Sequence, residues 1–214
     1  MHIWLTKTKI HFKNKDFLFS FFTALLFLLF SYCMNYIAGI YASKIASNSV
    51  TDIILSNIPV YNVYYLFTYG TLLVWVPLIF IIFLHPKRIP FVLKSIALFL
   101  IIRSIFVCLT HIGPFPTQIN IAGGLNSVMN FTGDLFFSGH TGLPFLLALI
   151  FWQEKNLRFF FLICSVFFGI VVLLGHLHYS IDVLGAFFIT YAIFHMAEFF
   201  FKKDRLLFFS GIEN

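Results

Sequence analysis

The chain has 214 residues, of which 60% are hydrophobic and only 10% are charged, and its mean hydropathy is +0.95. Soluble domains are close to half apolar and about a quarter charged, so this composition excludes a soluble globular protein and predicts an integral membrane protein. The net charge of +6 does not indicate a nucleic-acid partner, because the Lys and Arg residues gather at the ends of apolar runs.

Six apolar runs are long enough, or nearly long enough, to cross a bilayer as helices, which takes about 20 residues. They lie at roughly 17–42, 61–84, 91–112, 138–152, 159–176 and 180–201. We therefore predict an all-α, polytopic membrane bundle of six transmembrane helices that forms a single domain over residues 1–214. The fourth run is the shortest, so one end of that helix is expected to lie beneath the membrane surface.

The basic residues predict the orientation of this bundle, because cytoplasmic loops and tails carry the excess of Lys and Arg. One side of the predicted topology collects Lys7, Lys9, Lys13, Lys15, Lys87, Arg88, Lys155, Arg158, Lys202, Lys203 and Arg205. The loops of the other side contain only Lys44. Both termini are therefore predicted to be cytoplasmic, and the loops near 43–60, 113–137 and 177–179 to face the periplasm, the exterior or an organelle lumen.

The longest of these outer loops, at 113–137, is rich in turn-forming residues and is expected to be irregular. It contains Gly113, Pro114, Pro116, Gly123, Gly124 and Gly133. Long loops without secondary structure of their own are often functional, so this loop is a candidate part of a site.

The first polar cluster is the sequence GDLFFSGHT at 133–141, which ends this loop and opens the fourth helix. Ser138 and Gly139 offer a hydroxyl and unpaired backbone N–H groups, and the helix dipole favours an anion there, so the cluster suits a phosphate. His140 lies in the first turn, where it can protonate a departing oxygen. The alternative is that Ser138 is only an N-cap and His140 an interfacial polar residue.

The second polar cluster is the sequence HYSID at 178–182, which lies between the fifth and sixth helices. His178 and Asp182 are four residues apart, so they share one face of a helix. Asp182 can then accept a hydrogen bond from one imidazole nitrogen and leave the other free to attack, which is the arrangement of an oriented nucleophile. The alternative is a satisfied His–Asp pair at a helix start, where the dipole favours an Asp.

Arg103 is a charged residue within the third apolar run, roughly 13 Å below the outer surface at a rise of about 1.5 Å per residue. A guanidinium at that depth costs about 3 kcal/mol unless it is paired or hydrated, so it indicates a functional site. Its planar fork of donors suits a phosphate. The alternatives are a structural ion pair with Asp134 or Asp182, or a side chain that reaches to the surface. The predicted topology brings Arg103 and both polar clusters to the same side.

The two clusters together resemble the sphingomyelin synthase branch of the type 2 phosphatidic acid phosphatase superfamily. The resemblance rests on GDLFFSGHT at 133–141 and on HYSIDV at 178–183, followed by Ala186 and Thr190. It extends more weakly to Arg103 through Pro116 and to Asp52 and Pro59, and it covers all six predicted helices in order.

The resemblance implies that His178 is the nucleophile of a phospho-histidine intermediate, that Asp182 orients it and that His140 is the general acid. Arg103, Ser138 and Gly139 would hold the phosphate. Asp134, Tyr179 and His176 are candidate accessory residues.

Enzymes of this branch move a phosphorylated head group from a phospholipid donor to a lipid hydroxyl, such as that of ceramide or diacylglycerol. The resemblance therefore makes membrane lipids the expected partners, with the reaction on the non-cytoplasmic face. Relatives of the branch hydrolyse lipid phosphates with water and need no metal, so no metal and no cofactor are expected.

The chain departs from the broader phosphatase pattern near both functional segments. That pattern has Ser-Arg and then Gly before the nucleophilic histidine, where this chain has Val171, Val172 and His176. It also has Lys and Pro around the arginine, where this chain has Ile96 and Ser104. Simple phosphatase activity is therefore the second hypothesis.

Two other classes of function are weighed against an enzyme. A haem or metal protein would use His111, His140, His176 and His178 as ligands, but no spacing demands such a site, and a cation would repel Arg103. A transporter would also place charged residues inside the membrane. Against a transporter, the charged and ionisable residues within the predicted bundle gather at its outer face. The inner half of the bundle has only Lys94, His195 and Glu198.

Overall fold

The computed structural model describes residues 11–121 and 133–211, and every regular element within them is a helix. The all-α prediction is therefore confirmed for the described part of the chain, whereas Lys7, Lys9, Gly123 and Gly124 lie outside it. The elements are α2 (Lys15–Ile45), α3 (Tyr64–Gly70), α4 (Leu72–Leu84), η1 (Pro86–Arg88), α5 (Ile89–Leu109), α6 (Gly139–Ile150), α7 (Lys155–Leu174), α8 (Ser180–Phe200) and α9 (Lys202–Ser210).

Within residues 11–121 and 133–211, five stretches of helix are long and apolar enough to cross a membrane. They are α2, α3 with α4, η1 with α5, α7 and α8, and they indicate an integral membrane protein. The remaining predicted span, the fourth in chain order at 138–152, is α6. It has only 12 residues and is therefore about 18 Å long. It is too short to cross the hydrocarbon core of about 30 Å by itself, which agrees with the expectation that one end of this helix is recessed.

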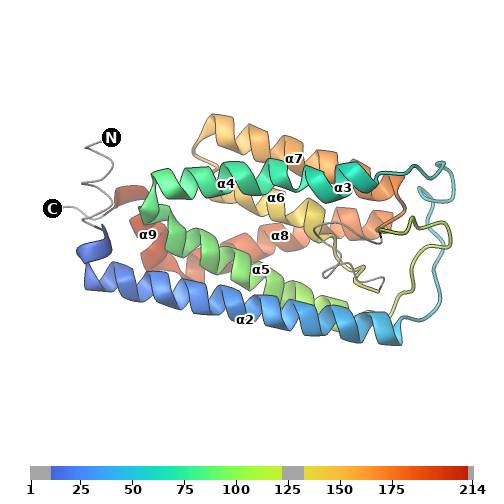
Figure 1. Ribbon diagram of the computed structural model, residues 1–214, viewed down its shortest axis with the longest axis horizontal. Helices are drawn as coiled ribbons and strands as arrows, with labels where there is room; N and C mark the ends of the chain where they lie inside the picture. Colours follow the sequence, from blue (N-terminus) through green and yellow to red (C-terminus); the bar gives the residue numbers. More distant parts are fainter. Residues whose placement is uncertain (1–10, 122–132, 212–214) are drawn as a thin grey trace.

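The short helix α6 lies at the centre of the bundle and packs against α5, α7 and α8 (Figure 1). Eight of its 12 residues are buried. Its last carbonyl, that of Ile150, accepts a hydrogen bond of 2.9 Å from Nη1 of Arg205, which reaches in from α9. This contact caps one end of α6 and leaves the other end, at Ser138, for the polar residues of the first cluster.

The other helices surround α6 in pairs. α2 packs along most of α5, while α3 and α4 lie against α7 (Figure 1). α4 and α5 follow each other in the chain but make little contact, because η1 turns the chain between them. The loops at 46–63, 110–121 and 175–179 lie at one end of the bundle, here called the loop end, and α2 begins at the opposite end, here called the α9 end.

The helix α9 was not predicted as a separate element, because the last apolar run was extended only to residue 201. Phe201 separates α8 from α9. Asp204 of α9 accepts hydrogen bonds from Ser20 of α2 and from Lys94 of α5, the latter at 2.7 Å. This buried polar cluster fastens α9 to the first and third spans at the α9 end.

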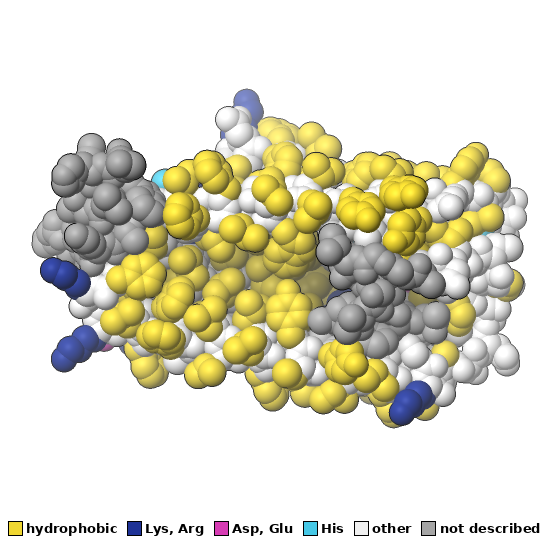
Figure 2. All heavy atoms as spheres, in the orientation of Figure 1, with side chains coloured by type: hydrophobic (Ala, Val, Ile, Leu, Met, Phe, Trp, Pro, Cys, Tyr) yellow, Lys and Arg dark blue, Asp and Glu magenta, His cyan; other side chains and the backbone are white. Residues whose placement is uncertain are grey.

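Apolar side chains cover the flank of the bundle, and most of the charged side chains in that view lie at its margins (Figure 2). Phe22, Leu26 and Phe80 are all more than half exposed. Exposed apolar surface of this extent requires an apolar solvent, which the hydrocarbon of a bilayer provides.

The centre of the bundle depends on a glycine that lets α6 approach its neighbours. A Cβ atom on Gly142 would lie 2.8 Å from Oγ1 of Thr190 and 2.9 Å from the ring of Phe99, so any larger residue must push α5 or α8 away. A Cβ atom on Gly185 of α8 would meet Phe136 at an ordinary 3.8 Å.

We predict that Gly142→Ala lowers stability by about 1–3 kcal/mol because of this overpacking, although alanine favours a helix. Gly185→Ala is the matched control and should be neutral or slightly stabilising. Thermal unfolding of both variants in the same detergent measures the difference. Equal unfolding temperatures for the two variants would contradict the close packing of α6.

Candidate active site

A turn at the end of α7 places His178. Leu177 N–H donates 2.8 Å to the carbonyl of Val172, and His176 N–H donates 3.0 Å to that of Leu173, which is the Schellman pattern of a helix C-terminus. His176 adopts the left-handed conformation that this turn requires, with φ of +53°. The turn places His178 at the loop end of the bundle, two residues before α8 begins at Ser180.

The His178 imidazole is buried and oriented mainly by a backbone carbonyl. Its Nδ1 lies 2.7 Å from the carbonyl oxygen of Leu135 and 3.5 Å from Oδ2 of Asp182. Because a carbonyl can only accept, Nδ1 must carry the proton and Nε2 the lone pair of the neutral ring. The geometry therefore presents Nε2 as a nucleophile, and the carbonyl of Leu135 is an orienting group that the sequence does not reveal.

Asp182 lies beneath His178 as a fully buried carboxylate. Its Oδ2 accepts a hydrogen bond of 2.9 Å from Tyr179 N–H, and its Oδ1 has no hydrogen-bond partner among the described residues. A buried carboxylate with an unsatisfied oxygen favours positive charge nearby. Asp182 is thus placed to stabilise an imidazole ring that becomes cationic.

Ser138 begins α6 and connects the two polar clusters. Its backbone N–H donates 3.2 Å to the carbonyl of Asp182, and its Oγ accepts from the N–H of Thr141 at 3.4 Å. The Ser138 side chain is thus an N-cap, as the alternative interpretation held, and it is fully buried. Within the described residues, the N–H groups of Gly139 and His140 remain for another acceptor, at the positive end of the α6 dipole.

His140 lies at the same end of α6 and is half-buried between two phenylalanine rings. Its ring centroid is 4.0 Å from that of Phe67 in α3 and 5.8 Å from that of Phe168 in α7. It is also close enough to His178 and Arg103 to interact with both electrostatically. The structure therefore brings the predicted acid and the predicted nucleophile to one site.

The Arg103 guanidinium is buried beside the start of α6 and bonded by all three nitrogens. Its Nε donates 2.9 Å to the carbonyl of Phe137, its Nη1 lies 2.8 Å from Oδ1 of Asp134, and its Nη2 is 3.4 Å from the Asp134 carbonyl. Asn35 of α2 adds a longer contact of 3.5 Å to Nη1. The structural ion pair with Asp134, one of the alternatives for Arg103, is therefore present.

Arg103 nevertheless lies against the first turn of α6. A Cβ atom on Gly139 would come within 3.1 Å of Nε, so a larger residue there would displace the guanidinium slightly from the first turn of α6. The positive charge of Arg103 thus adds to that of the helix terminus, even though its hydrogen bonds go to Asp134 and Phe137.

Two of the candidate accessory residues, His176 and Tyr179, make hydrogen bonds to the loops at the loop end. His176 is buried, with Nδ1 at 2.5 Å from Oγ1 of Thr117. Tyr179 Oη donates 2.8 Å to the carbonyl of Gly113 and accepts from Val50 N–H at 3.2 Å. Burial raises the pKa of the Tyr179 phenol, so it stays protonated and keeps this donor. Both residues support the site from outside.

Asp52 has a structural role that the sequence indicated only weakly. Its Oδ2 accepts 2.6 Å from Ser180 N–H and its Oδ1 accepts from Ile54 and Leu55 N–H, at 2.8 and 3.0 Å. Burial alone would raise the pKa of this carboxyl, but the backbone hydrogen bonds together lower the pKa below its ordinary value. The local turn at 52–55 is a recognisable Asp signature, whereas the contact with the start of α8 bridges 128 residues and leaves no local pattern.

The histidines of the haem or metal hypothesis do not gather as ligands. His111 packs against Tyr41 with ring centroids 6.2 Å apart, and His176 points to Thr117. Within residues 11–121 and 133–211, no group of three or more His, Cys, Asp or Glu side chains is arranged to hold a metal ion.

Residues 132–199 match the family described as PAP2 superfamily C-terminal. No curated protein and no solved structure matches the chain. The matched segment holds both polar clusters, and the match supports a relationship to the type 2 phosphatidic acid phosphatase superfamily, whose members are phosphatases or phosphotransferases. Together with the apolar helices, it fits a membrane enzyme that acts on lipid phosphates.

The Arg103–Asp134 pair gives a direct prediction for stability. Its side chains are only 7% and 14% exposed, so removing one partner leaves a buried, unpaired charge. We predict that Arg103→Gln and Asp134→Asn each cost about 3 kcal/mol, and that the double variant costs clearly less than their sum. Thermal unfolding of the four proteins measures this coupling.

Glu198→Gln provides the control, because Glu198 is 34% exposed in its ion pair with Arg205 and should contribute about 1 kcal/mol or less. Additive losses in the double variant would contradict a buried Arg103–Asp134 pair.

Proposed function

We propose that this protein is an integral membrane lipid phosphotransferase resembling sphingomyelin synthase, which moves a phosphorylated head group from a phospholipid to the hydroxyl of ceramide or diacylglycerol. The observation that carries the proposal is the buried His178. Its Nδ1 proton is held by the carbonyl of Leu135 at 2.7 Å with Asp182 beside it, so that Nε2 is free to attack.

In the first half of the proposed reaction, Nε2 of His178 attacks the phosphorus of the donor lipid. The Nε2–P bond forms as the bond between phosphorus and the glycerol oxygen breaks, and the departing alkoxide takes a proton from His140. The phosphorylated ring with its Nδ1 proton is cationic. Asp182 Oδ2, 3.5 Å from Nδ1, stabilises that charge.

In the second half, His140 takes the proton of the acceptor hydroxyl, whose oxygen attacks phosphorus. The Nε2–P bond then breaks, and His178 returns to its neutral form with the proton on Nδ1. The same two histidines thus serve both halves of the transfer, and no net proton is gained or lost.

Negative charge that grows on the phosphate oxygens is met by the start of α6. The N–H groups of Gly139 and His140 and the α6 dipole are donors of fixed position, which need no rearrangement as the charge develops. The Arg103 guanidinium beside Gly139 adds a positive potential. Ser138 contributes as the N-cap that aligns these groups, since its hydroxyl is fully buried.

The proposed substrates reach the site from the side of the bundle. Figure 2 shows a hollow between α4 and α5, lined by hydrophobic side chains, and these two helices make little contact. An apolar opening in the flank suits the acyl chains of a lipid whose head group lies at the loop end. With a lipid phosphate monoester as donor and water as acceptor, the same attack by His178 would make the protein a lipid phosphate phosphatase.

We predict that the purified protein in nanodiscs converts phosphatidylcholine and a fluorescent ceramide, or a fluorescent diacylglycerol, into a new phosphorylated lipid. His178→Ala should abolish this product, a loss of at least about 1,000-fold, because no other group replaces the nucleophile. Chromatography with mass spectrometry detects both the product and the released diacylglycerol.

His111→Ala is the matched control, because His111 is an exposed histidine at the same end of the bundle and should leave the rate unchanged. Release of inorganic phosphate or of a phospho-alcohol, without a new phosphorylated lipid, would make the protein a hydrolase instead. If the lipids remain unchanged although the protein is folded, both the transferase and the hydrolase hypotheses are contradicted, and the transporter hypothesis is favoured.

A further inference from the structure

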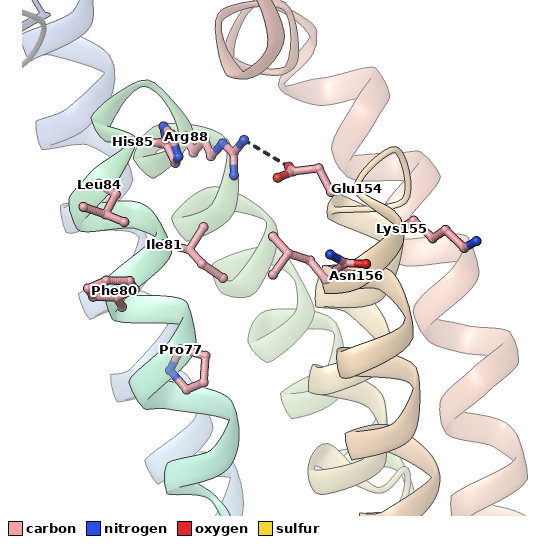
Figure 3. A pocket seen from close by; sticks show the side chains of 10 residues that line it. Pro77, Phe80, Ile81, Leu84, His85, Arg88, Glu154, Lys155 and Asn156 are labelled. Carbon is pink, nitrogen blue, oxygen red and sulfur yellow. Dashed lines mark ion pairs between the residues drawn. The ribbon is translucent and has the colours of Figure 1, made fainter. Parts of the chain in front are cut away.

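A second site lies at the α9 end of the bundle, where a groove of about 580 Å³ separates α4 from the start of α7. Figure 3 shows this α4–α7 groove, with Phe80, Ile81 and Leu84 on the α4 side and Asn156 on the α7 side. Its volume is within the range of about 300–1,000 Å³ that is usual for small-ligand sites. It is separate from the candidate active site, which lies at the loop end.

One wall of the groove is apolar and open to the flank of the bundle. Phe80 is 62% exposed and Leu84 is 39% exposed, while Ile81 and Leu157 are half-buried between the two helices. A surface of this kind in a membrane faces hydrocarbon, so an acyl chain is the natural occupant of the apolar part.

One end of the groove is polar, and there two basic side chains, Arg88 and Lys155, accompany one acidic side chain, Glu154. Nη2 of Arg88 lies 3.0 Å from Oε1 of Glu154, and this ion pair bridges the groove (Figure 3). The Arg88 guanidinium is held in place by the rings of Phe151 and Phe208, 5.6 and 5.2 Å away. Lys155 contributes a second positive charge nearby, although its side chain points away from Arg88.

The start of α7 adds to this positive potential. Glu154 is its N-cap residue but its side chain makes no capping hydrogen bond, because it is turned towards Arg88. The first backbone N–H groups of α7 therefore have no side-chain cap, and Asn156 and Leu157 beside them line the groove. Together with Arg88, this arrangement suits a phosphodiester in the plane of the lipid head groups.

We infer that the α4–α7 groove binds one anionic phospholipid from the leaflet at the α9 end. Its phosphate would lie between Arg88 and the start of α7, and one acyl chain would run along Phe80 and Ile81. The amphipathic lining favours a lipid over a soluble anion, because the soluble anion would leave the apolar wall unfilled. This site is independent of the proposed transferase reaction and needs no turnover.

Native mass spectrometry tests the inference on the full chain, released from nanodiscs that contain equal amounts of dioleoyl phosphatidylglycerol and dioleoyl phosphatidylcholine. We expect the protein to retain one phosphatidylglycerol in preference to phosphatidylcholine. Arg88→Gln should weaken this binding roughly fivefold to tenfold, whereas Arg158→Gln, which removes the same charge outside the groove, should change it less than twofold.

The apolar wall has its own pair of variants on the same helix. Ile81→Trp fills the groove and should abolish the retained lipid, whereas Ile79→Trp, at a position 59% exposed on the flank, should not. If Ile81→Trp fails to fold, Phe80→Ala replaces it, because Phe80 is exposed and its removal shortens the wall without opening the core.

Equal retention of the two lipids would overturn the head-group part of the inference. Retention unchanged in Ile81→Trp and Phe80→Ala, or lost equally in the Ile79→Trp control, would overturn the site itself. None of these results depends on enzyme activity, so failure here is distinguishable from failure of the proposed function.

Discussion

A guanidinium buried inside the membrane bundle is the constraint on which the site depends. An Arg at this depth costs about 3 kcal/mol unless it is satisfied, and Arg103 is satisfied by Asp134 and by the carbonyls of Asp134 and Phe137. These contacts fix the segment that leads into α6, and the same segment carries the Leu135 carbonyl that orients His178. Arg103 thus helps to determine the orientation of His178, the proposed nucleophile, through this segment and without direct contact with the imidazole.

The length of α6 gives the site its depth. A helix of about 18 Å, fixed at Ile150 by Arg205 near the α9 end, stops short of the opposite surface. Its N-terminus therefore opens inside the bundle, where Ser138 N–H donates to the carbonyl of Asp182 in the first turn of α8. In the proposed reaction, the phosphate of the lipid binds at this recessed end of α6, with its head group towards the loop end and its acyl chains towards the flank.

Hydrophobic runs and helical spacing predicted most of the fold, and they predicted that the two polar clusters lie at the same end of the bundle. They gave the five long spans, the short fourth helix and the pairing of His178 with Asp182, because each depends on local sequence. They missed α9, which is partly polar, and the break between α3 and α4 at Thr71, which lies inside one apolar run. The Leu135 carbonyl and the bond from Asp52 to Ser180 were also missed, since a backbone acceptor and a long-range cap have no local signature. His176 is among the candidate accessory residues, but its contact with Thr117 depends on the turn after α7 and has no local signature either.

The central claim is that Nε2 of His178 becomes covalently bound to the phosphate of the donor lipid. The most direct test is to mix the protein with a donor phospholipid and to leave out the acceptor lipid. The reaction is quenched in alkali, which preserves phosphoramidates, and adducts are mapped by mass spectrometry of peptides. The account predicts a mass increase equal to the phosphorylated head group on His178, linked through Nε2, which is lost on brief acid treatment. Turnover of lipid with no adduct on His178, or an adduct on another side chain, would contradict it.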